Sequence, residues 1–101
     1  MINKIIPEDK IQKTKKLIER SENIVITCHV SPDGDAIGAS LGLYHFLDSQ
    51  DKNVNIVTPD LLPSNLLFLK GSRDVVVYTR YQEFAEELIG NADLIFCLDS
   101  N

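Results

Sequence analysis

One imidazole and two carboxylates lie within seven consecutive residues, at His29, Asp33 and Asp35. They directly follow a short apolar, β-branched run, Ile24 to Cys28, which is typical of a buried strand. Open α/β sheets bind ligands at the carboxyl ends of their strands, so this segment lies where a site is expected. One imidazole nitrogen and several carboxylate oxygens suit Mn²⁺ or Mg²⁺ better than a metal that prefers thiolates. The segment therefore predicts a metal site.

Asp99 has a similar position, because it follows a second apolar run, Leu94 to Leu98. If that strand pairs beside the first one, Asp99 lies roughly 5 Å laterally from the His29 segment, which is the spacing of neighbouring strands. A carboxylate there could bridge two metal ions roughly 3.5–4 Å apart, as in two-metal phosphoryl hydrolases. Asp99 is therefore a further candidate ligand.

Each of these residues also has a purely structural interpretation. Asp35 could be the N-cap of the next helix, Asp33 a turn residue before glycine, and His29 or Asp99 an ordinary strand-end residue. The grouping of three such side chains at this spacing favours the functional interpretation. A helix that starts just after Asp35 would add free backbone N–H groups and a positive dipole end, which both favour a phosphate group.

The elements that must position these residues alternate between helical and strand patterns. Apolar residues at helical spacing predict helices, and short β-branched runs predict strands. The predicted helices are Glu8 to Arg20, Ala36 to Ser49 and Gln82 to Ile89, with one or two turns at Pro63 to Leu69 and a glycine stop at Gly90-Asn91. The predicted strands are Ile24 to Cys28, Val54 to Val57, Asp74 to Tyr78 and Asp93 to Leu98. The alternation predicts an α/β fold: a mainly parallel, doubly wound sheet with helices on both faces.

Length and composition narrow the class of protein. The 101 residues suffice for one small domain, and 44% hydrophobic with 25% charged residues is typical of a globular chain. No apolar run is long enough to span a membrane and no signal-peptide core is present, so we expect a cytoplasmic protein without a membrane partner. The net charge of −5 argues against an unaided grip on a nucleic-acid backbone.

Other residues are better explained by packing. Cys28 and Cys97 lie inside apolar runs, so we expect small, buried, reduced core residues rather than a disulfide. Gly38 and Gly42 are expected to permit close helix–sheet packing, because neither a P-loop nor a dinucleotide-binding pattern is present. His45, in the middle of a predicted helix, is expected to be a surface or packing residue.

The segment from His29 to Ser40, HVSPDGDAIGAS, closely resembles the first motif of the DHH phosphoesterase superfamily. It is most similar to the branch of nanoRNA-degrading oligoribonucleases and 3′-phosphoadenosine 5′-phosphate (pAp) phosphatases. The Phe96 to Asp99 segment is similar to the second motif of the family. The resemblance implies metal-ligand roles, with catalysis through two Mn²⁺ ions (or Mg²⁺) and Asp99 bridging the pair. The implied metal ligands are His29, Asp33, Asp35 and Asp99, and the three aspartates are the implied catalytic residues.

The activity that the resemblance implies is the hydrolysis of phosphoester bonds in short oligoribonucleotides, pAp or cyclic dinucleotides. The expected partner is therefore a nucleotide or a short single-stranded RNA. The alternatives are a RecJ-like single-strand exonuclease, a pyrophosphatase, or a non-catalytic module that binds a nucleotide or a partner.

The namesake Asp-His-His motif, a later aspartate and the substrate-binding domain of the family do not occur in these residues. The resemblance therefore implies that residues 1–101 are the N-terminal part of a DHH domain within a longer enzyme. We expect this piece alone to be inactive. We also expect its sheet to lack strands at one edge, so that it self-associates through that exposed edge.

Overall fold

The computed structural model describes residues 8–28, 34–59, 62 and 69–98. Helices and strands alternate along the chain, as the sequence pattern predicts. In chain order the elements are α1 (Glu8–Arg20), β1 (Asn23–Cys28), α2 (Gly34–Ser49), β2 (Asn53–Thr58), the 3₁₀ helix η2 (Ser72–Asp74), β3 (Val76–Val77), α3 (Gln82–Gly90) and β4 (Leu94–Leu98). The helical turns expected at Pro63 to Leu69 fall almost entirely outside the described residues.

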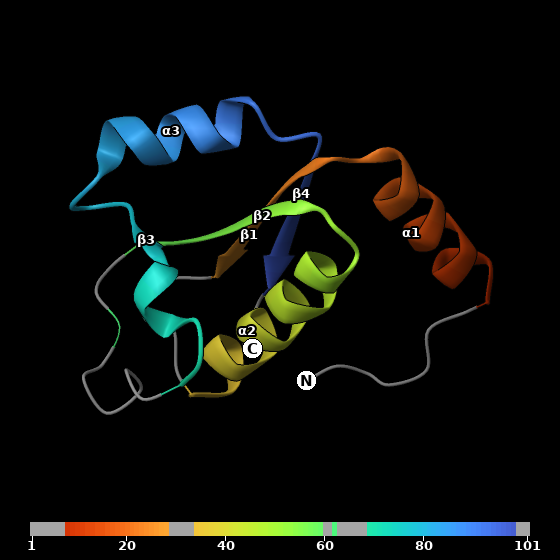
Figure 1. Ribbon diagram of the computed structural model, residues 1–101, viewed down its shortest axis with the longest axis horizontal. Coiled ribbons are helices and arrows are strands. Elements are labelled where there is room, and N and C mark those ends of the chain that lie inside the picture. Colours follow the sequence, from red (N-terminus) through yellow and green to blue (C-terminus); the bar gives the residue numbers. More distant parts are fainter. Residues whose placement is uncertain (1–7, 29–33, 60–61, 63–68, 99–101) are drawn as a thin grey trace.

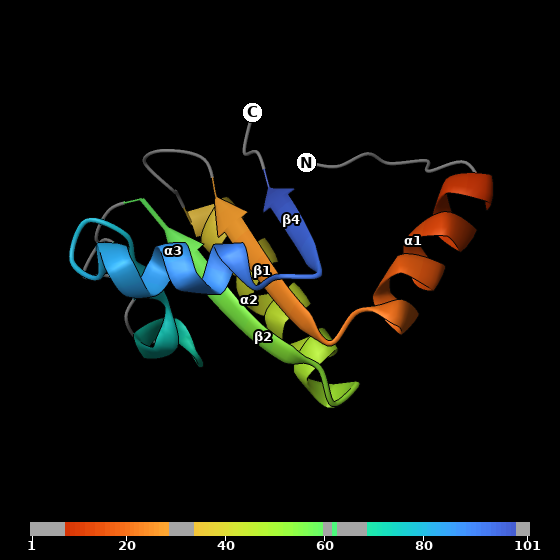
Figure 2. The ribbon, with the colours of Figure 1, turned by 90° about the horizontal axis from the view of Figure 1, so that it is seen from above.

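The strands of the described residues form one parallel sheet of four strands, in the order β3-β2-β1-β4. β1 is central, and its Ile24 is paired with Val54 of β2 and with Leu94 of β4. Helix α2 covers one face of the sheet and α3 lies over the other (Figures 1 and 2). The predicted α/β fold, with a mainly parallel sheet and helices on both faces, is confirmed.

The core divides between the two faces because side chains alternate along each strand. The larger cluster, on the α2 face, consists of the buried residues Ile24, Ile26, Ile37, Leu41, Leu47, Val54 and Ile56. The smaller cluster, on the α3 face, contains the buried residues Val25, Val57 and Ala85. Burying each large aliphatic side chain contributes about 1.5–3 kcal/mol, so the α2 face supplies most of the stabilisation.

Several boundaries differ from the sequence prediction. α2 begins at Gly34 rather than Ala36, so Asp35 belongs to its first turn and not to the preceding loop. Gly90 is the last residue of α3 rather than a left-handed stop: the N–H of Asn91 donates to the carbonyl of Glu87 at 3.0 Å and closes the helix. The predicted third strand shortens to two residues, because the 3₁₀ helix η2 occupies the chain just before it.

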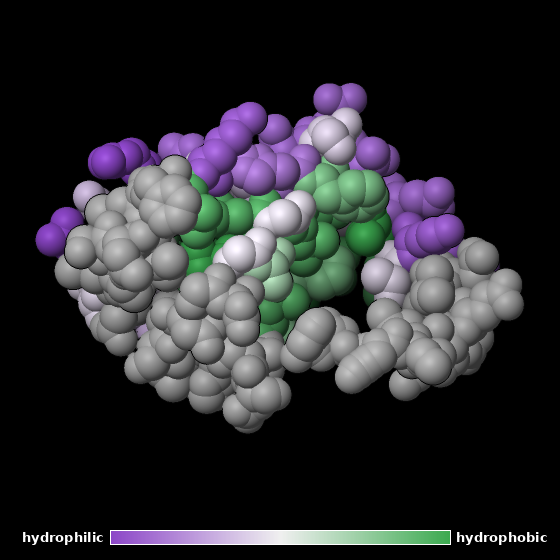
Figure 3. Space-filling view, turned by 90° about the horizontal axis from the view of Figure 1, so that it is seen from below, coloured by the Kyte–Doolittle hydropathy of each residue, from purple (hydrophilic) through white to green (hydrophobic). Residues whose placement is uncertain are grey.

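The outward side of α2 carries little polar character. Gly38, Ala39, Gly42 and Phe46 are exposed there, and apolar residues of the described part of the chain form a patch in the middle of this side of the molecule (Figure 3). A Cβ atom added at Gly38 or Gly42 would meet no atom of the described residues within 4 Å. The expectation that these glycines permit close helix–sheet packing is therefore wrong, because both face away from the sheet. None of the described helices combines the length and the apolar composition that a bilayer crossing needs.

One glycine has a packing role that the sequence did not suggest. Gly71, just before η2, adopts a left-handed conformation (φ 88°), and an added Cβ would lie 3.2 Å from the His45 ring. His45 also contacts the carbonyl oxygen of Lys70 through Nε2 at 3.0 Å. His45 is thus a packing residue of α2, as expected.

The two cysteines were expected in the core. Cys97 instead has an exposed, free thiol, because it projects from the edge strand β4. Neighbouring Ile95 points to the same side of the sheet and is 45% exposed. The side chain of Cys28 lies outside what the structure describes. The core assignment of Cys97 is wrong because α3 lies over β1 and β2, and among the described residues no helix lies over this side of β4 (Figure 2).

Candidate functional site

The last residues of β1 and β4 are register partners, Cys28 with Leu98. Because the two strands are adjacent and parallel, they end at the same edge of the sheet, roughly 4.8 Å apart. The sequence prediction of a shared site required β1 and β4 to be neighbours, and this strand pairing is confirmed. His29 and Asp99 are the next residues along the chain after these two strand ends.

The candidate ligands themselves are mostly outside the described part of the chain. This applies to His29, Asp33 and Asp99, and the side chain of Asp35 is not described either. Their convergence therefore stays a prediction. Within the described residues, no three His, Cys, Asp or Glu side chains form a group that could hold a metal ion. The chemistry of the candidate donor set, one imidazole and three carboxylates, fits a hard divalent cation.

The register of β4 against β1 is fixed at the opposite end of the strands. The N–H of Asp93 donates to the carbonyl oxygen of Asn23 at 2.7 Å, and the Asp93 carboxylate accepts the N–H of Asn23 at 2.9 Å. The N–H of Glu22 donates to the same carboxylate oxygen at 3.0 Å. These bonds lower the pKa of Asp93 below its ordinary value of 3.8. They hold the start of β4, and therefore its end, in place beside β1.

Helix α2 points its N-terminus at the edge where β1 ends and then runs back beneath the sheet (Figure 2). Its free N–H groups and positive dipole end therefore lie at the edge predicted for the site. Asp35 sits in the first turn, where an acidic residue is favourable. The interpretation of Asp35 as an N-cap outside the helix does not hold, because α2 already includes Gly34.

Thr27 and Cys97 lie one residue before the two strand ends and contact each other. The Thr27 hydroxyl is 3.3 Å from the Cys97 sulfur and 3.4 Å from the carbonyl oxygen of Phe96. Sequence reasoning missed this pair, since a threonine in a β-branched run is ordinary strand composition. The contact adds a side-chain link between β1 and β4 next to the candidate site.

A small cavity of about 180 Å³ opens at the carboxyl ends of β1 and β2. Its lining is largely apolar and consists of Thr27, Val57, Thr58, Pro59 and Tyr78. The Tyr78 hydroxyl donates to Glu86 of α3 at 2.7 Å, which fixes the ring that forms one wall. This hydrogen bond, with a smaller contribution from burial, raises the pKa of Tyr78 above 10.0. Tyr78 is therefore a neutral hydroxyl at physiological pH.

Residues 23–101 match the DHH family, N-terminal domain. The chain belongs to the DHH family. This match begins at the first residue of β1, so it includes both strand ends and the segment between β1 and α2. DHH proteins are a family of phosphoester hydrolases that generally depend on metal ions, and the first-motif resemblance of His29 to Ser40 agrees with this membership.

A solved crystal structure is similar over nearly the whole chain. The crystal structure of an exopolyphosphatase-related protein from Bacteroides fragilis is 56% identical, with a TM-score of 0.93 over 99% of this chain. This chain spans 29% of the length of that protein. The two chains therefore share the fold described above.

Proposed function

We propose that residues 1–101 are the N-terminal part of a DHH domain in a longer enzyme that hydrolyses phosphoester bonds. The register of Cys28 with Leu98 carries this proposal, because it starts the two candidate ligand segments from adjacent points of one sheet edge. His29, Asp33, Asp35 and Asp99 would hold two divalent cations, with Mn²⁺ the first choice and Mg²⁺ the alternative. Bound there, the cations would acidify water and offset the charge of the phosphate oxygens.

The described part of the chain would orient the substrate rather than react with it. The N-terminus of α2 lies at this edge and favours the phosphate group. The cavity lined by Thr27, Pro59 and Tyr78 lies at the carboxyl edge of the same sheet and offers largely apolar contacts. At about 180 Å³ this cavity is too small to enclose a nucleoside, but it could contact part of the apolar face of a base, which supports short oligoribonucleotides, pAp or cyclic dinucleotides as substrates.

A second candidate is the hydrolysis of pyrophosphate or polyphosphate. It is favoured by the description of the similar Bacteroides fragilis protein as exopolyphosphatase-related. An inorganic polyphosphate would make no use of the apolar cavity, and on this ground we place the nucleotide proposal first. A RecJ-like exonuclease activity on longer single strands and a non-catalytic binding module are the remaining alternatives.

The test uses the full-length protein with Mn²⁺ and a panel of substrates: pAp, a short oligoribonucleotide, a cyclic dinucleotide, pyrophosphate and polyphosphate. We expect turnover of nucleotide substrates, and loss of most of it in Asp33→Ala and Asp99→Ala. Asp48→Ala, an exposed aspartate on α2, is the matched control and should keep full activity. Near-normal turnover in either ligand variant contradicts the metal-ligand roles, and no turnover of any substrate favours the binding module.

The isolated chain of 101 residues should lack measurable activity, because the family resemblance assigns further motifs to residues beyond these. Robust turnover of pAp by the isolated chain with Mn²⁺ would contradict this.

We also propose a cytoplasmic location, which the free thiol of Cys97 fits, since cytosolic thiols are kept reduced.

A further inference from the structure

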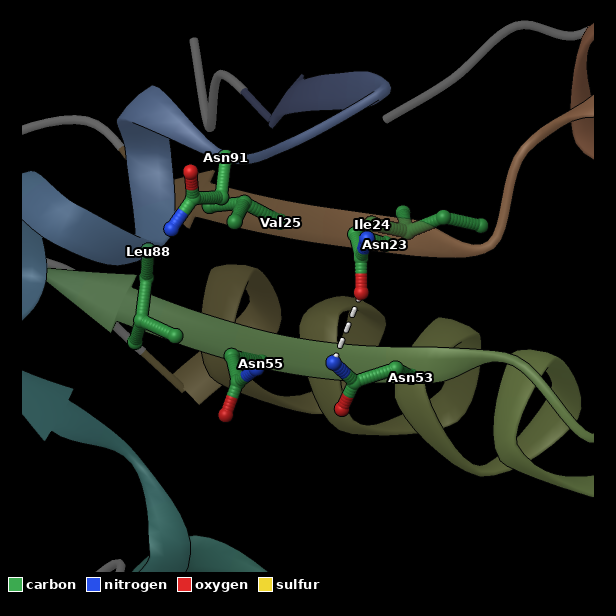
Figure 4. Close-up of a pocket in the computed structure, with 7 residues that line it drawn as sticks. All are labelled: Asn23, Ile24, Val25, Asn53, Asn55, Leu88 and Asn91. Carbon is green, nitrogen blue, oxygen red and sulfur yellow. Dashed lines mark hydrogen bonds between the residues drawn. The ribbon is translucent and has the colours of Figure 1, made fainter.

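A second cavity, of about 350 Å³, lies on the α3 face of the sheet at the starts of β1 and β2. It is at the end of the sheet opposite to the candidate metal site. Four asparagines, Asn23, Asn53, Asn55 and Asn91, contribute to its lining (Figure 4). The neighbouring apolar contacts come from β1 and from Leu88 of α3. None of the described lining residues carries a charge.

Asn55 occupies an unusual position for its residue type. It lies inside β2 on the side that faces α3, paired with buried Val25 and two residues before buried Val57. Asparagine is depleted in strands, and a half-buried amide is unfavourable unless it is hydrogen-bonded. A β-branched apolar residue would suit the α3-side core better. Packing in the core therefore does not explain an asparagine at position 55, whereas a function of its amide in binding would.

The hydrogen bonds around the cavity leave two amides available. The Asn53 side chain donates to Oδ1 of Asn23 at 2.8 Å, which occupies part of that pair (Figure 4). Neither the Asn55 nor the Asn91 side chain makes a hydrogen bond within the part of the chain that the structure describes. These two amides come from different elements, β2 and the end of α3, and line the same space. Each amide offers an NH₂ donor group and a carbonyl acceptor side by side.

The charge next to the cavity disfavours an anion. The Asp93 carboxylate accepts the N–H of Asn23, a lining residue, at 2.9 Å. The carbonyl groups that end α3 add the negative end of the helix dipole. A phosphate group would be repelled here, in contrast to the N-terminus of α2. The ligand should therefore be uncharged, with donors and acceptors on an edge and an apolar face.

We propose that this cavity binds an uncharged planar ring of the nucleobase type, with Asn55 and Asn91 on the ring edge and Leu88 and Val25 against its face. An asparagine amide matches the paired donor and acceptor on the edge of adenine. The cavity volume lies at the small end of the range for ligand pockets, which suits a nucleoside rather than a larger molecule. This binding site rests on the cavity alone and does not depend on the proposed hydrolytic activity.

The experiment follows the side-chain NH₂ signals of Asn55 and Asn91 by NMR in the ¹⁵N-labelled chain during titration with adenosine. We expect saturable shifts of both signals, weaker shifts with AMP because of its phosphate, and none with ribose or inorganic phosphate. Asn91→Ala should weaken adenosine binding about three- to tenfold, the effect of losing a hydrogen bond or two. Gln50→Ala, an exposed amide at the end of α2, is the control and should bind normally.

A second variant separates binding from folding. Asn55→Val should abolish adenosine binding and raise the unfolding midpoint, because valine completes the apolar row between Val25 and Val57. A lower midpoint would show that the amide serves the fold and would overturn the proposal. Absence of saturable shifts with any nucleoside at millimolar concentration would also overturn it, and so would equal shifts with ribose alone.

Discussion

Asp93 and Asn23 lie 70 residues apart and hold each other through two reciprocal hydrogen bonds. The Asp93 N–H donates to the Asn23 carbonyl, and the Asn23 N–H donates to the Asp93 carboxylate, at 2.7 and 2.9 Å. The pair joins the starts of two parallel strands that end at the candidate site. Removing the carboxylate should therefore lower the stability of the sheet and weaken the alignment of the strand ends.

The first prediction concerns the pH dependence that Asp93 confers. Its pKa is lowered by the N–H groups of Asn23 and then Glu22, so the folded state binds a proton less readily than the unfolded chain. The stabilisation is therefore complete above the ordinary pKa of 3.8 and is lost as pH falls through the lower folded value. Asp93→Asn should lower the urea midpoint of unfolding at pH 7. The difference in midpoint between this variant and the unsubstituted chain should become smaller at low pH. Asp48→Asn is the control, and an equal drop in both variants would contradict the role of Asp93.

The second prediction concerns alkaline pH. The hydrogen bond from Tyr78 to Glu86 raises the pKa of Tyr78 above 10.0, so its stabilisation is present below that pH and is lost as pH rises through the folded pKa. Tyr78→Phe should be less stable than the unmodified chain at pH 7, and the difference should shrink above pH 10. Tyr81→Phe changes an exposed tyrosine at the start of α3 and should leave stability unchanged at both pH values. A constant difference for Tyr78→Phe across this range would argue against the hydrogen bond.

The third prediction compares two kinds of glycine. Gly42 lies on the open side of α2, so Gly42→Ala should stabilise the 101-residue chain by about 0.5–1 kcal/mol through the gain in helix propensity. Gly71 has a φ of 88° and little room beside His45 and Leu41, so Gly71→Ala should destabilise by about 1 kcal/mol or more. Chemical denaturation measures both. Destabilisation by Gly42→Ala would show that this side of α2 is covered in solution.

The fourth prediction concerns self-association through β4. Within the described residues β4 pairs only with β1, and its Ile95 and Cys97 are exposed, so the outer edge offers unpaired backbone groups beside apolar surface. We expect light scattering on the isolated 101-residue chain to show an average molecular mass that rises with protein concentration. Ile95→Lys should reduce that rise. Phe84→Lys is the control, because Phe84 is similarly exposed but lies on α3. A clean monomer at high concentration would refute the expectation.

The α/β class, the alternation of elements and the candidate ligand segment could be predicted from the sequence, because each rests on local patterns. Apolar runs such as Ile24 to Cys28 identify strands through their own composition. The spacing of His29, Asp33 and Asp35 identifies a segment suited to a cation without any knowledge of distant residues. Local patterns failed at element ends and on exposure: Gly90 continues its helix, and Cys97 is exposed although its neighbours in sequence are apolar.

Tertiary structure alone decided which distant residues meet. The order β3-β2-β1-β4 placed Leu98 beside Cys28. The strand patterns in the sequence did not determine whether these two strands are neighbours. It also brought Asp93 to Asn23, and Asn91 to the same cavity as Asn55, although nothing near any of these residues in sequence indicates a partner. The physical reason is that helix and strand periodicity are set by neighbours within a few residues. Strand order and exposure depend instead on how apolar surface from the whole chain is buried.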